Sequence, residues 1–207
     1  MLGGSSSINA MLYIRGQKED YDHWAALGND GWSFSDVLPY LKSTQHQERG
    51  ADNFHGVGGQ LNVADSISKP AIHDSFISSA QQAGFPLNDD FNGENQEGVG
   101  YYQVTQKNGQ RCSAAKSFLT LNVNRSNLTI ITNAHVQNII FDSQSNAKMG
   151  NDDLALVDNE LKIHGIKSLR VIDASIMPTL ISGNTNAPTI MIAAKIADVI
   201  LASWEQI

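Results

Sequence analysis

Apolar residues recur every three or four positions in several stretches of the first half of the chain, and this spacing predicts amphipathic helices. Two of these helices lie within residues 17–45, where a glycine-rich break at 28–31 ends the first. Ser33 or Ser35 can cap the second, whose apolar stripe comprises Val37, Leu38, Tyr40 and Leu41. We therefore expect a pair of helices joined by a tight turn.

A third helix is predicted over residues 74–84, where a glycine and a proline follow the last apolar position. We expect its apolar residues to face inward: Phe76, Ile77, Ala80 and Ala83. The tryptophans Trp24 and Trp32 are large enough to anchor a core, and we expect them to do this rather than to bind a ligand.

Alternating apolar and polar positions predict strands at residues 60–63, 101–106 and 128–141. Between the last two strands, residues 113–120 fit a short helix. The glycines at 56–59 are spaced like a nucleotide-binding loop, but no hydrophobic strand precedes them and no helix follows. We interpret them as a surface loop that leads into a hairpin.

The C-terminal part reads as a strand, a loop and a helix. Residues 169–172 favour a short buried strand that ends at Asp173, and Pro188 fits the first turn of the helix. A polar loop that leads into a helix N-terminus suits an anionic or electron-rich ligand, because free N–H groups point at it. The predicted apolar stripe of this helix comprises Ile190, Ala193, Ala194, Ala197, Ile200 and Leu201.

The composition is that of a globular protein: 207 residues, of which 41% are hydrophobic and 17% charged, leave ample sequence for a core. A formal net charge of −7 argues against nucleic acid and against an anionic membrane as partners. The single cysteine, Cys112, excludes an internal disulfide framework and is predicted to be a small buried residue. No secretory signal follows Met1, and no apolar segment is predicted to span a membrane, so we expect a cytoplasmic protein.

No metal site is predicted. Residues 88–98 are acidic, but they lack the regular alternation of a calcium loop, and we expect a solvated loop there. No two of the six histidines show the close spacing of a metal-binding pair.

Three segments together resemble one known family. LRVIDASIMP with the loop GNTNAPT, the opening MLGGSSSINAMLYIRG, and the stretch from Gly109 to Val136 are similar to signatures of the glucose–methanol–choline (GMC) family of FAD-dependent oxidoreductases. The two adjacent glycines and three serines of the opening make a loop that can lay backbone N–H groups against a phosphate or a flavin.

The resemblance implies a set of site residues. Asn184 falls on the position of a catalytic partner residue in the loop before the last helix. Some relatives carry a histidine, covalently bound to the flavin, at the position of Ile8, so the resemblance implies FAD that is held non-covalently here. The positions that would contact FAD are Met1, Gly4, Ser5, Asn9, Ala10, Met11, Leu12, Val136, Asp173, Ala174, Asn186 and Thr189.

The chain departs from the family pattern in two places. The strand–GxGxxG–helix unit of the family is not found, and the sequence jumps between residues 143 and 149. The family's catalytic histidine should lie just before Met149, where this chain has Asn146, Ala147 and Lys148. We therefore expect an incomplete α/β FAD/NAD(P)-binding domain that also lacks most of the substrate domain: a first portion at 1–142, a deletion junction at 143–148, and a closing segment at 149–207.

By resemblance, the function is alcohol or choline dehydrogenase-like: a CH–OH group of a small alcohol would pass a hydride to FAD. The Asn184 amide can orient the substrate oxygen, but an amide cannot take its proton. The alternative is a non-catalytic fragment or pseudoenzyme that binds FAD weakly or only packs with a partner. A hydroxynitrile lyase is a third and more distant reading. In each case a homo-oligomer or a partner chain would cover exposed sheet edges.

Overall fold

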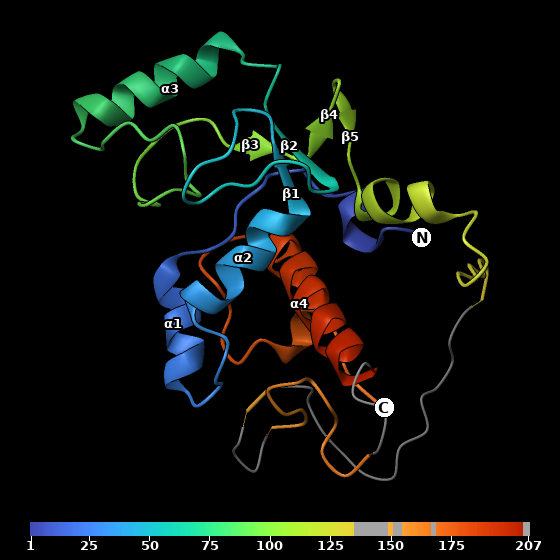
Figure 1. The fold of residues 1–207 in the computed structure, drawn as a ribbon. Coiled ribbons are helices and arrows are strands. Elements are labelled where there is room, and N and C mark those ends of the chain that lie inside the picture. Colours follow the sequence, from blue (N-terminus) through green and yellow to red (C-terminus); the bar gives the residue numbers. More distant parts are fainter. Residues whose placement is uncertain (135–148, 151–154, 167–168, 205–207) are drawn as a thin grey trace.

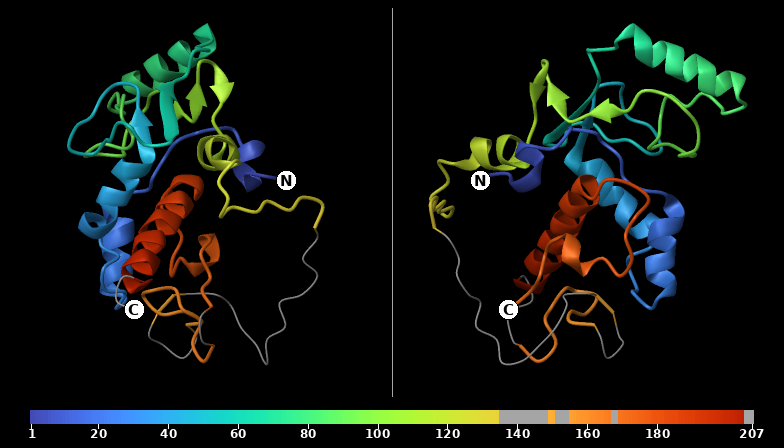
Figure 2. Two further views of the ribbon diagram at one scale, coloured as in Figure 1. Left: turned by 45° about the vertical axis from the view of Figure 1, so that its right-hand side comes forward. Right: turned by 180° about the vertical axis from the view of Figure 1, so that it is seen from behind.

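The computed structural model describes residues 1–134, 149–150, 155–166 and 169–204 (Figure 1). Three helices, α1, α2 and α4, pack together in one half of the molecule, while short strands and α3 form the other half (Figures 1 and 2). The helices are α1 (Lys18–Ala26), α2 (Phe34–Thr44), α3 (Ala71–Gln82) and α4 (Asn186–Trp204), and the shorter turns are η1 (Gly4–Ser7), η2 (Ala115–Leu119), η3 (Thr120–Asn122) and η4 (Ala174–Ile176).

Side-chain caps fix where α1 and α2 begin. Ser33 caps α2 in a capping box with Asp36, and Gln17 does the same for α1 with Asp20. In each box the carboxylate accepts from the backbone N–H of the cap residue, Asp20 from Gln17 at 2.7 Å and Asp36 from Ser33 at 3.0 Å. Of the two serines that the sequence offered for α2, Ser33 is therefore the cap.

The main core lies where α2 and α4 pack against α1 and the residues before η4. Trp24 and Trp32 are both completely buried, as predicted, and their ring centroids are 6.3 Å apart. Each indole also donates a hydrogen bond, Trp24 Nε1 to the carbonyl oxygen of Thr179 and Trp32 Nε1 to that of Asn159, at 3.0 Å. A buried indole needs such an acceptor, so the two rings join α1 and α2 to the C-terminal part of the chain.

The strands are few and short. In the larger sheet β1 (Gln45–Gln47) pairs in parallel with β2 (Leu61–Asp65), and β2 pairs antiparallel with β3 (Gln103–Val104). The smaller sheet is the hairpin of β4 (Gln106–Lys107) and β5 (Gln110–Arg111). The predicted strands at 60–63 and 101–106 are thus confirmed in part, and the predicted helix at 113–120 appears as η2.

Two glycines of the 56–59 cluster permit backbones to approach each other before β2. A Cβ at Gly56 would lie 2.0 Å from the carbonyl oxygen of Lys42, and one at Gly59 would lie 2.4 Å from the backbone nitrogen of Gln45. Any side chain at either position would clash with backbone, which cannot give way. Their role in packing β2 against the end of α2 supports the rejection of a nucleotide loop.

Two helices expose faces that the sequence predicted to be buried. None of the residues of α3 is buried, and Phe76 is 69% exposed, because within the described residues this helix lies at the edge of the molecule (Figures 1 and 2). On α4, Ala193, Ala197 and Leu201 of the predicted stripe are exposed. The face that packs into the core comprises instead Ala187, Pro188, Met191, Ile192 and Ile196. Because α4 is apolar nearly all round, its periodicity could not select the buried face.

The predicted strand at 169–172 is wrong. These residues form only an isolated bridge, between Lys162 and Arg170, because the described part offers them no longer strand with which to pair. Residues 128–134 are not a strand either, and the rest of that predicted strand, 135–141, lies outside the described residues. The central parallel sheet expected of an α/β domain is not formed by the described residues.

By length and composition α4 is also the one helix of the described residues that could cross a membrane, since it has 19 residues and a mean hydropathy of 1.4 over a window of 18. This differs from the expectation from sequence, which found no such segment. The core helix of a globular protein passes the same test, and five residues of α4 are buried in the core.

Candidate flavin-side site

Two of the segments that carry predicted site residues are distant in sequence but adjacent in the structure. Tyr13, which follows the N-terminal loop, shares a small buried cluster with Ala187 at the start of α4 and with Leu61 and Val63 of β2. Gly183 in the loop before α4 lies against Ile14, whose Cγ2 atom would be 3.1 Å from a Cβ at that glycine. The structure therefore brings the segment after the opening loop and the loop before α4 together.

Serine side chains fold the opening loop back on itself. Gly3 and Gly4 have left-handed φ angles of 85° and 54°, and η1 begins there. The buried Ser6 donates its hydroxyl hydrogen to the carbonyl oxygen of Gly3 at 2.5 Å and accepts from the Ala114 N–H at 2.9 Å. Gly4 and Ser5 stay exposed at the tip of this turn, where a ligand can approach their backbone.

Arg111 holds the second part of the same loop. Its Nη1 donates to the carbonyl oxygen of Ser6 at 3.1 Å and to Asn9 Oδ1 at 2.9 Å. Asn9 Oδ1 also accepts from the Met11 N–H at 3.0 Å, and Met11 has a left-handed φ of 64°. The Asn9 carboxamide oxygen thus shapes the loop. Sequence reasoning matched Arg111 to a family motif but assigned it no role.

Beyond Met11 the loop joins the larger sheet. The carbonyl oxygen of Met11 accepts from the Thr105 N–H at 2.8 Å, and Leu12 forms an antiparallel bridge with Val104. Met11 and Leu12 are half-buried there, while Met1 and Ala10 are exposed. These contacts fix the position of the loop relative to β3.

The loop before α4 presents an amide. Asn184 is exposed, and within the described residues nothing forms a hydrogen bond with its side chain. The Ser182 N–H and hydroxyl of the same loop donate to the carboxylate of Asp20 at 2.8 Å each, which ties the loop to α1. A positioned loop with a free amide at its tip can donate a hydrogen bond to a ligand oxygen.

The other predicted contact residues are engaged locally or lie outside the described residues. Asp173 Oδ1 accepts from the Ser175 N–H at 2.7 Å and so caps η4. Thr189 donates its hydroxyl hydrogen to the carbonyl oxygen of Thr185 at 2.7 Å within the first turn of α4, which begins at Asn186. Ala174 packs against the main core, and Val136 lies outside the described residues.

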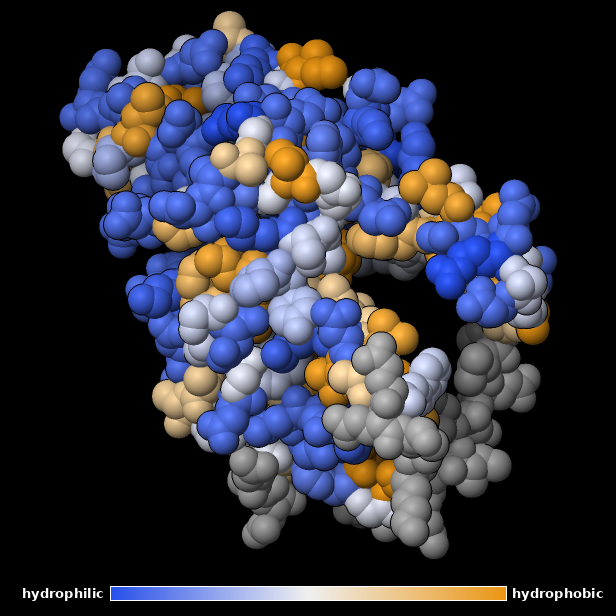
Figure 3. All heavy atoms as spheres, viewed as in Figure 1, coloured by the Kyte–Doolittle hydropathy of each residue, from blue (hydrophilic) through white to orange (hydrophobic). Residues whose placement is uncertain are grey.

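The surface is hollowed beside α4. In Figure 3 a hollow separates α4 from the segment that follows η2, and hydrophobic side chains border it. Both of these segments carry exposed apolar side chains: Leu121 and Val123 are 75% and 52% exposed, and Leu201 of α4 is 54% exposed.

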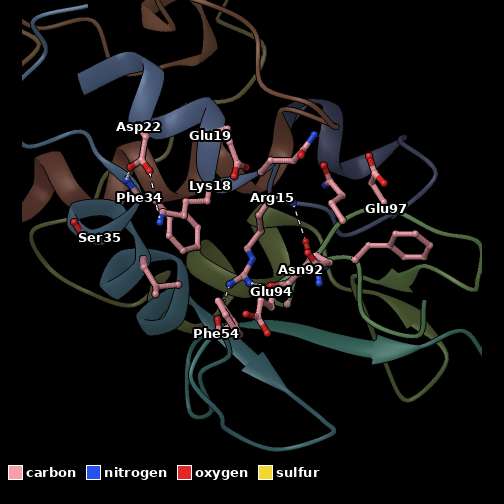
Figure 4. Close-up of a pocket in the computed structure, with 17 residues that line it drawn as sticks. Arg15, Lys18, Glu19, Asp22, Phe34, Ser35, Phe54, Asn92, Glu94 and Glu97 are labelled. Atoms are coloured by element: carbon pink, nitrogen blue, oxygen red, sulfur yellow. Dashed lines mark hydrogen bonds and ion pairs between the residues drawn. The ribbon is translucent and has the colours of Figure 1, made fainter. Parts of the chain in front are cut away.

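A separate cavity of 750 Å³ lies between the start of α1, α2 and the loop at 91–97 (Figure 4). None of the predicted site residues lines it. Its wall carries both signs of charge, with Lys18 and Asp22 from α1 and Glu94 and Glu97 from the loop. The loop that was predicted to be merely solvated therefore forms one wall of a cavity.

Arg15 anchors this wall (Figure 4). Its side chain is buried, and its guanidinium donates to the carbonyl oxygens of Phe54, at 2.7 Å, and of Asn92. Tyr21 donates its hydroxyl hydrogen to the carbonyl oxygen of Arg15 at 2.5 Å, and burial raises the pKa of this phenol. Tyr21 accordingly stays protonated and keeps its role as a donor.

A third group of polar side chains lies behind the same wall. Ligand-type atoms of Asp52, His55 and Asp90 all lie within 4.8 Å of one another. Burial acts to raise the pKa of Asp52, but hydrogen bonds from the Phe54 N–H and from His55 outweigh it, so this pKa lies below its ordinary value. Sequence spacing missed this group, because Asp90 comes from a loop distant in sequence.

Comparison of the sequence with known protein families matches a range that contains both the opening loop and the loop before α4. A sequence model described as GMC oxidoreductase matches residues 1–191. The chain belongs to the GMC oxidoreductase family. The resemblance inferred from the sequence is thereby confirmed.

Individual members of the GMC family are similar over part of their length. An alcohol dehydrogenase [acceptor] from Pseudomonas putida is 45% identical over 69% of this chain and 26% of its own length. An oxygen-dependent choline dehydrogenase from Sinorhizobium fredii is 43% identical over 63% of this chain and 24% of its own. The chain thus spans about a quarter of the length of these relatives.

Solved structures show the same partial match. Pyridoxine 4-oxidase from Mesorbium loti superimposes with a TM-score of 0.58 at 30% identity, over 61% of this chain and 26% of that protein. An FAD-dependent oxidoreductase from Chaetomium thermophilum gives a TM-score of 0.54 at 26% identity, over 59% and 23%. The mixed helix and strand arrangement of the described residues is therefore that of part of a GMC-type FAD-binding fold.

Proposed function

We propose that this GMC chain supplies the flavin-side wall of an FAD-dependent oxidoreductase that acts on the CH–OH group of a small alcohol, as alcohol and choline dehydrogenases do. The observation that supports it is the meeting of two loops. The opening loop, with Gly4 and Ser5 exposed, and the loop of Asn184 pack next to each other through Ile14 and Gly183.

The exposed residues fit the cofactor. Glycines at Gly3 and Gly4 let backbone come close to a flat or phosphorylated group, and the start of α4 favours negative charge. We propose that the FAD is held non-covalently by the predicted contact residues, with Arg111 and Asn9 fixing the shape of the opening loop. Bound FAD would supply the hydride acceptor.

The chain's own part in the reaction is positioning. The Asn184 amide would donate to the substrate oxygen and orient its carbon toward the cofactor. It cannot remove the hydroxyl proton, and residues 169–204 around it contain no histidine. Absence of a general base costs about 10²- to 10⁴-fold in rate. We therefore propose that turnover by this chain by itself is slow.

One observation favours a second candidate, a non-catalytic form that binds FAD weakly or packs with a partner. Asn146, Ala147 and Lys148 stand where the family's catalytic histidine is expected. In this case the hollow beside α4 would be covered by another chain or by a second copy. We propose a cytoplasmic setting for either form, because the single cysteine, Cys112, fits a reducing compartment.

Flavin binding and turnover separate the candidates. The purified chain is titrated with FAD and followed by flavin fluorescence and by absorbance at about 450 nm, where oxidised flavin absorbs. Choline and a simple primary alcohol are then added without oxygen, and bleaching of the flavin is recorded. Saturable binding with slow bleaching that falls further in N184A supports the alcohol oxidoreductase. Saturable binding without bleaching supports the non-catalytic form, and no binding contradicts both flavin roles.

A further inference from the structure

The strongest unassigned group in the described residues is the triad of Asp52, His55 and Asp90. His55 is 2% exposed and lies between the two carboxylates. Its Nδ1 is 2.9 Å from Asp52 Oδ1, and its Nε2 is 3.5 Å from Asp90 Oδ1. Asp52 precedes β2 and Asp90 belongs to the loop at 88–98, so the ring connects two loops that are distant in sequence.

Asp52 fixes the orientation and the tautomer of the ring. Both of its carboxylate oxygens lie within 3.0 Å of Nδ1, so this nitrogen carries a hydrogen and donates it. Asp52 is itself held by the N–H groups of Phe54 and His55, which donate to Oδ1 at 2.7 and 2.6 Å. In the neutral ring Nε2 is then the nitrogen with the free lone pair.

No hydrogen-bond donor among the described residues reaches that lone pair. Nε2 of His55 is buried and forms no hydrogen bond, and the nearest acidic atom is Asp90 Oδ1. A lone pair that faces a carboxylate oxygen repels it, so a positive group must stand between the two atoms. A proton would draw them to about 2.7–3.2 Å, the ordinary length of an N–H···O bond. The observed 3.5 Å is longer than this range.

The spacing fits two ligands of one metal ion. With metal–nitrogen and metal–oxygen bonds of about 2.0–2.2 Å and a tetrahedral angle, the two ligand atoms lie about 3.4 Å apart. We propose that His55 Nε2 and Asp90 Oδ1 bind a divalent transition-metal ion of the zinc class, with Asp52 as the carboxylate that orients the histidine. A carboxylate that accepts from the other ring nitrogen is the usual support of a metal-binding histidine.

The surroundings provide charge and access. Asp52 and Asp90 are acidic and the neighbouring Arg15 is basic, so two carboxylates face one guanidinium and can attract a cation. The Asp90 side chain is 29% exposed, so water can complete the coordination. Nitrogen and carboxylate ligands together favour Zn²⁺ or Co²⁺ over Ca²⁺ and Mg²⁺. The ion would lock the loops of Phe54 and Asn92, which line the cavity of Figure 4.

The test uses the purified full chain without flavin, so its result is independent of the proposed oxidoreductase function. Zn²⁺ binding is measured by equilibrium dialysis after removal of metals with a chelator, and Co²⁺ is added to obtain a visible spectrum. We expect one Zn²⁺ per chain. D90N and H55Q should lose this binding, and D52N should weaken it about 10- to 100-fold, as loss of an orienting carboxylate does.

H46Q is the matched control, because His46 Nδ1 accepts from the Gly58 N–H and His46 belongs to no group of possible metal ligands among the described residues. Circular dichroism identifies any variant that does not fold. For D90N and D52N, which alter partly exposed side chains, binding can be compared in folded protein. Equal Zn²⁺ affinity of D90N and the wild type would overturn the site. So would nitrogen NMR spectra in which both ring nitrogens of His55 remain protonated at saturating Zn²⁺.

Discussion

The guanidinium of Arg15 donates to the carbonyl oxygen of Asn92, and the Asn92 side chain forms two further hydrogen bonds with the segment before α1. Asn92 Oδ1 accepts from the Arg15 N–H at 2.9 Å, and Nδ2 donates to the carbonyl oxygen of Tyr13 at 3.1 Å. Both side chains are buried. Because this pairing spans 77 positions of sequence, it attaches the acidic loop to the segment before α1.

The first prediction follows from that pairing. N92A should destabilise the fold by about 1–3 kcal/mol, because it leaves the buried N–H of Arg15 and carbonyl of Tyr13 unsatisfied. Asn95 lies in the same loop with an exposed side chain, and N95A should change stability by less than about 0.5 kcal/mol. Urea unfolding curves of both variants give the comparison, and equal midpoints would contradict the anchoring role.

A second prediction concerns the opening loop. R111Q should speed amide hydrogen exchange in residues 1–12 by about tenfold, since it removes charged hydrogen bonds to the Ser6 carbonyl and to Asn9. R125Q is the control, because Arg125 is exposed and, in the part of the chain that the structure describes, its side chain bonds only to Asn127 Oδ1, at 3.2 Å. Exchange measured by mass spectrometry after pepsin digestion should differ between the two variants. A loop that exchanges alike in both is not held by Arg111.

Local patterns predicted much of the helical half of the molecule. Helix ends depend on neighbouring residues, so a cap at Ser33 or Ser35 could be inferred before any packing was known, and the structure selects Ser33. Burial of Trp24, Trp32 and Cys112 also follows from the residue type. The sequence could not show which face of a helix, or which edge of a strand, packs against another element. The buried side of α4 depends on where α2 lies, and residues 169–172 needed a partner strand that local sequence cannot reveal.

For the site too, local sequence identified some residues, and only tertiary contacts revealed the others. Residues of the opening loop and of the loop before α4 were identified by resemblance, and the structure places these two loops together. The role of Arg111 came only from contacts across the fold, although its motif was visible. His55 and Asp90 meet by tertiary folding, so no spacing rule for metal ligands could have paired them.

A third prediction tests which side of α4 is in the core. Ile196 is completely buried, so I196A should destabilise the fold by about 2–5 kcal/mol through lost packing and a cavity. Leu201 belonged to the stripe predicted from sequence but is 54% exposed, and L201A should cost less than about 0.5 kcal/mol. Chemical denaturation of the two variants decides between the faces. A larger loss in L201A would favour the face predicted from sequence.

The last prediction concerns a hydrogen bond between α3 and the strand region. Tyr101 donates its hydroxyl hydrogen to Asp74 Oδ1 at 2.7 Å, and this bond to a carboxylate raises the pKa of Tyr101 above its ordinary value of 10.0. As the pH rises, Tyr101 loses its proton at a lower pH in the unfolded chain than in the folded one. The hydrogen bond therefore contributes fully to the free energy of unfolding below about pH 10, and its contribution declines as the pH rises further.

Ultraviolet titration of the phenolate, with Y101F as the reference spectrum, measures this pKa. D74N should return it toward 10.0, because the neutral amide no longer disfavours the phenolate. D89N is the control, since the backbone carbonyl of Asp89, and not its side chain, bonds to Arg49. The same Tyr101 pKa in D74N and wild type would show that α3 is not tied to Tyr101, and α3 would then have to be held by other contacts.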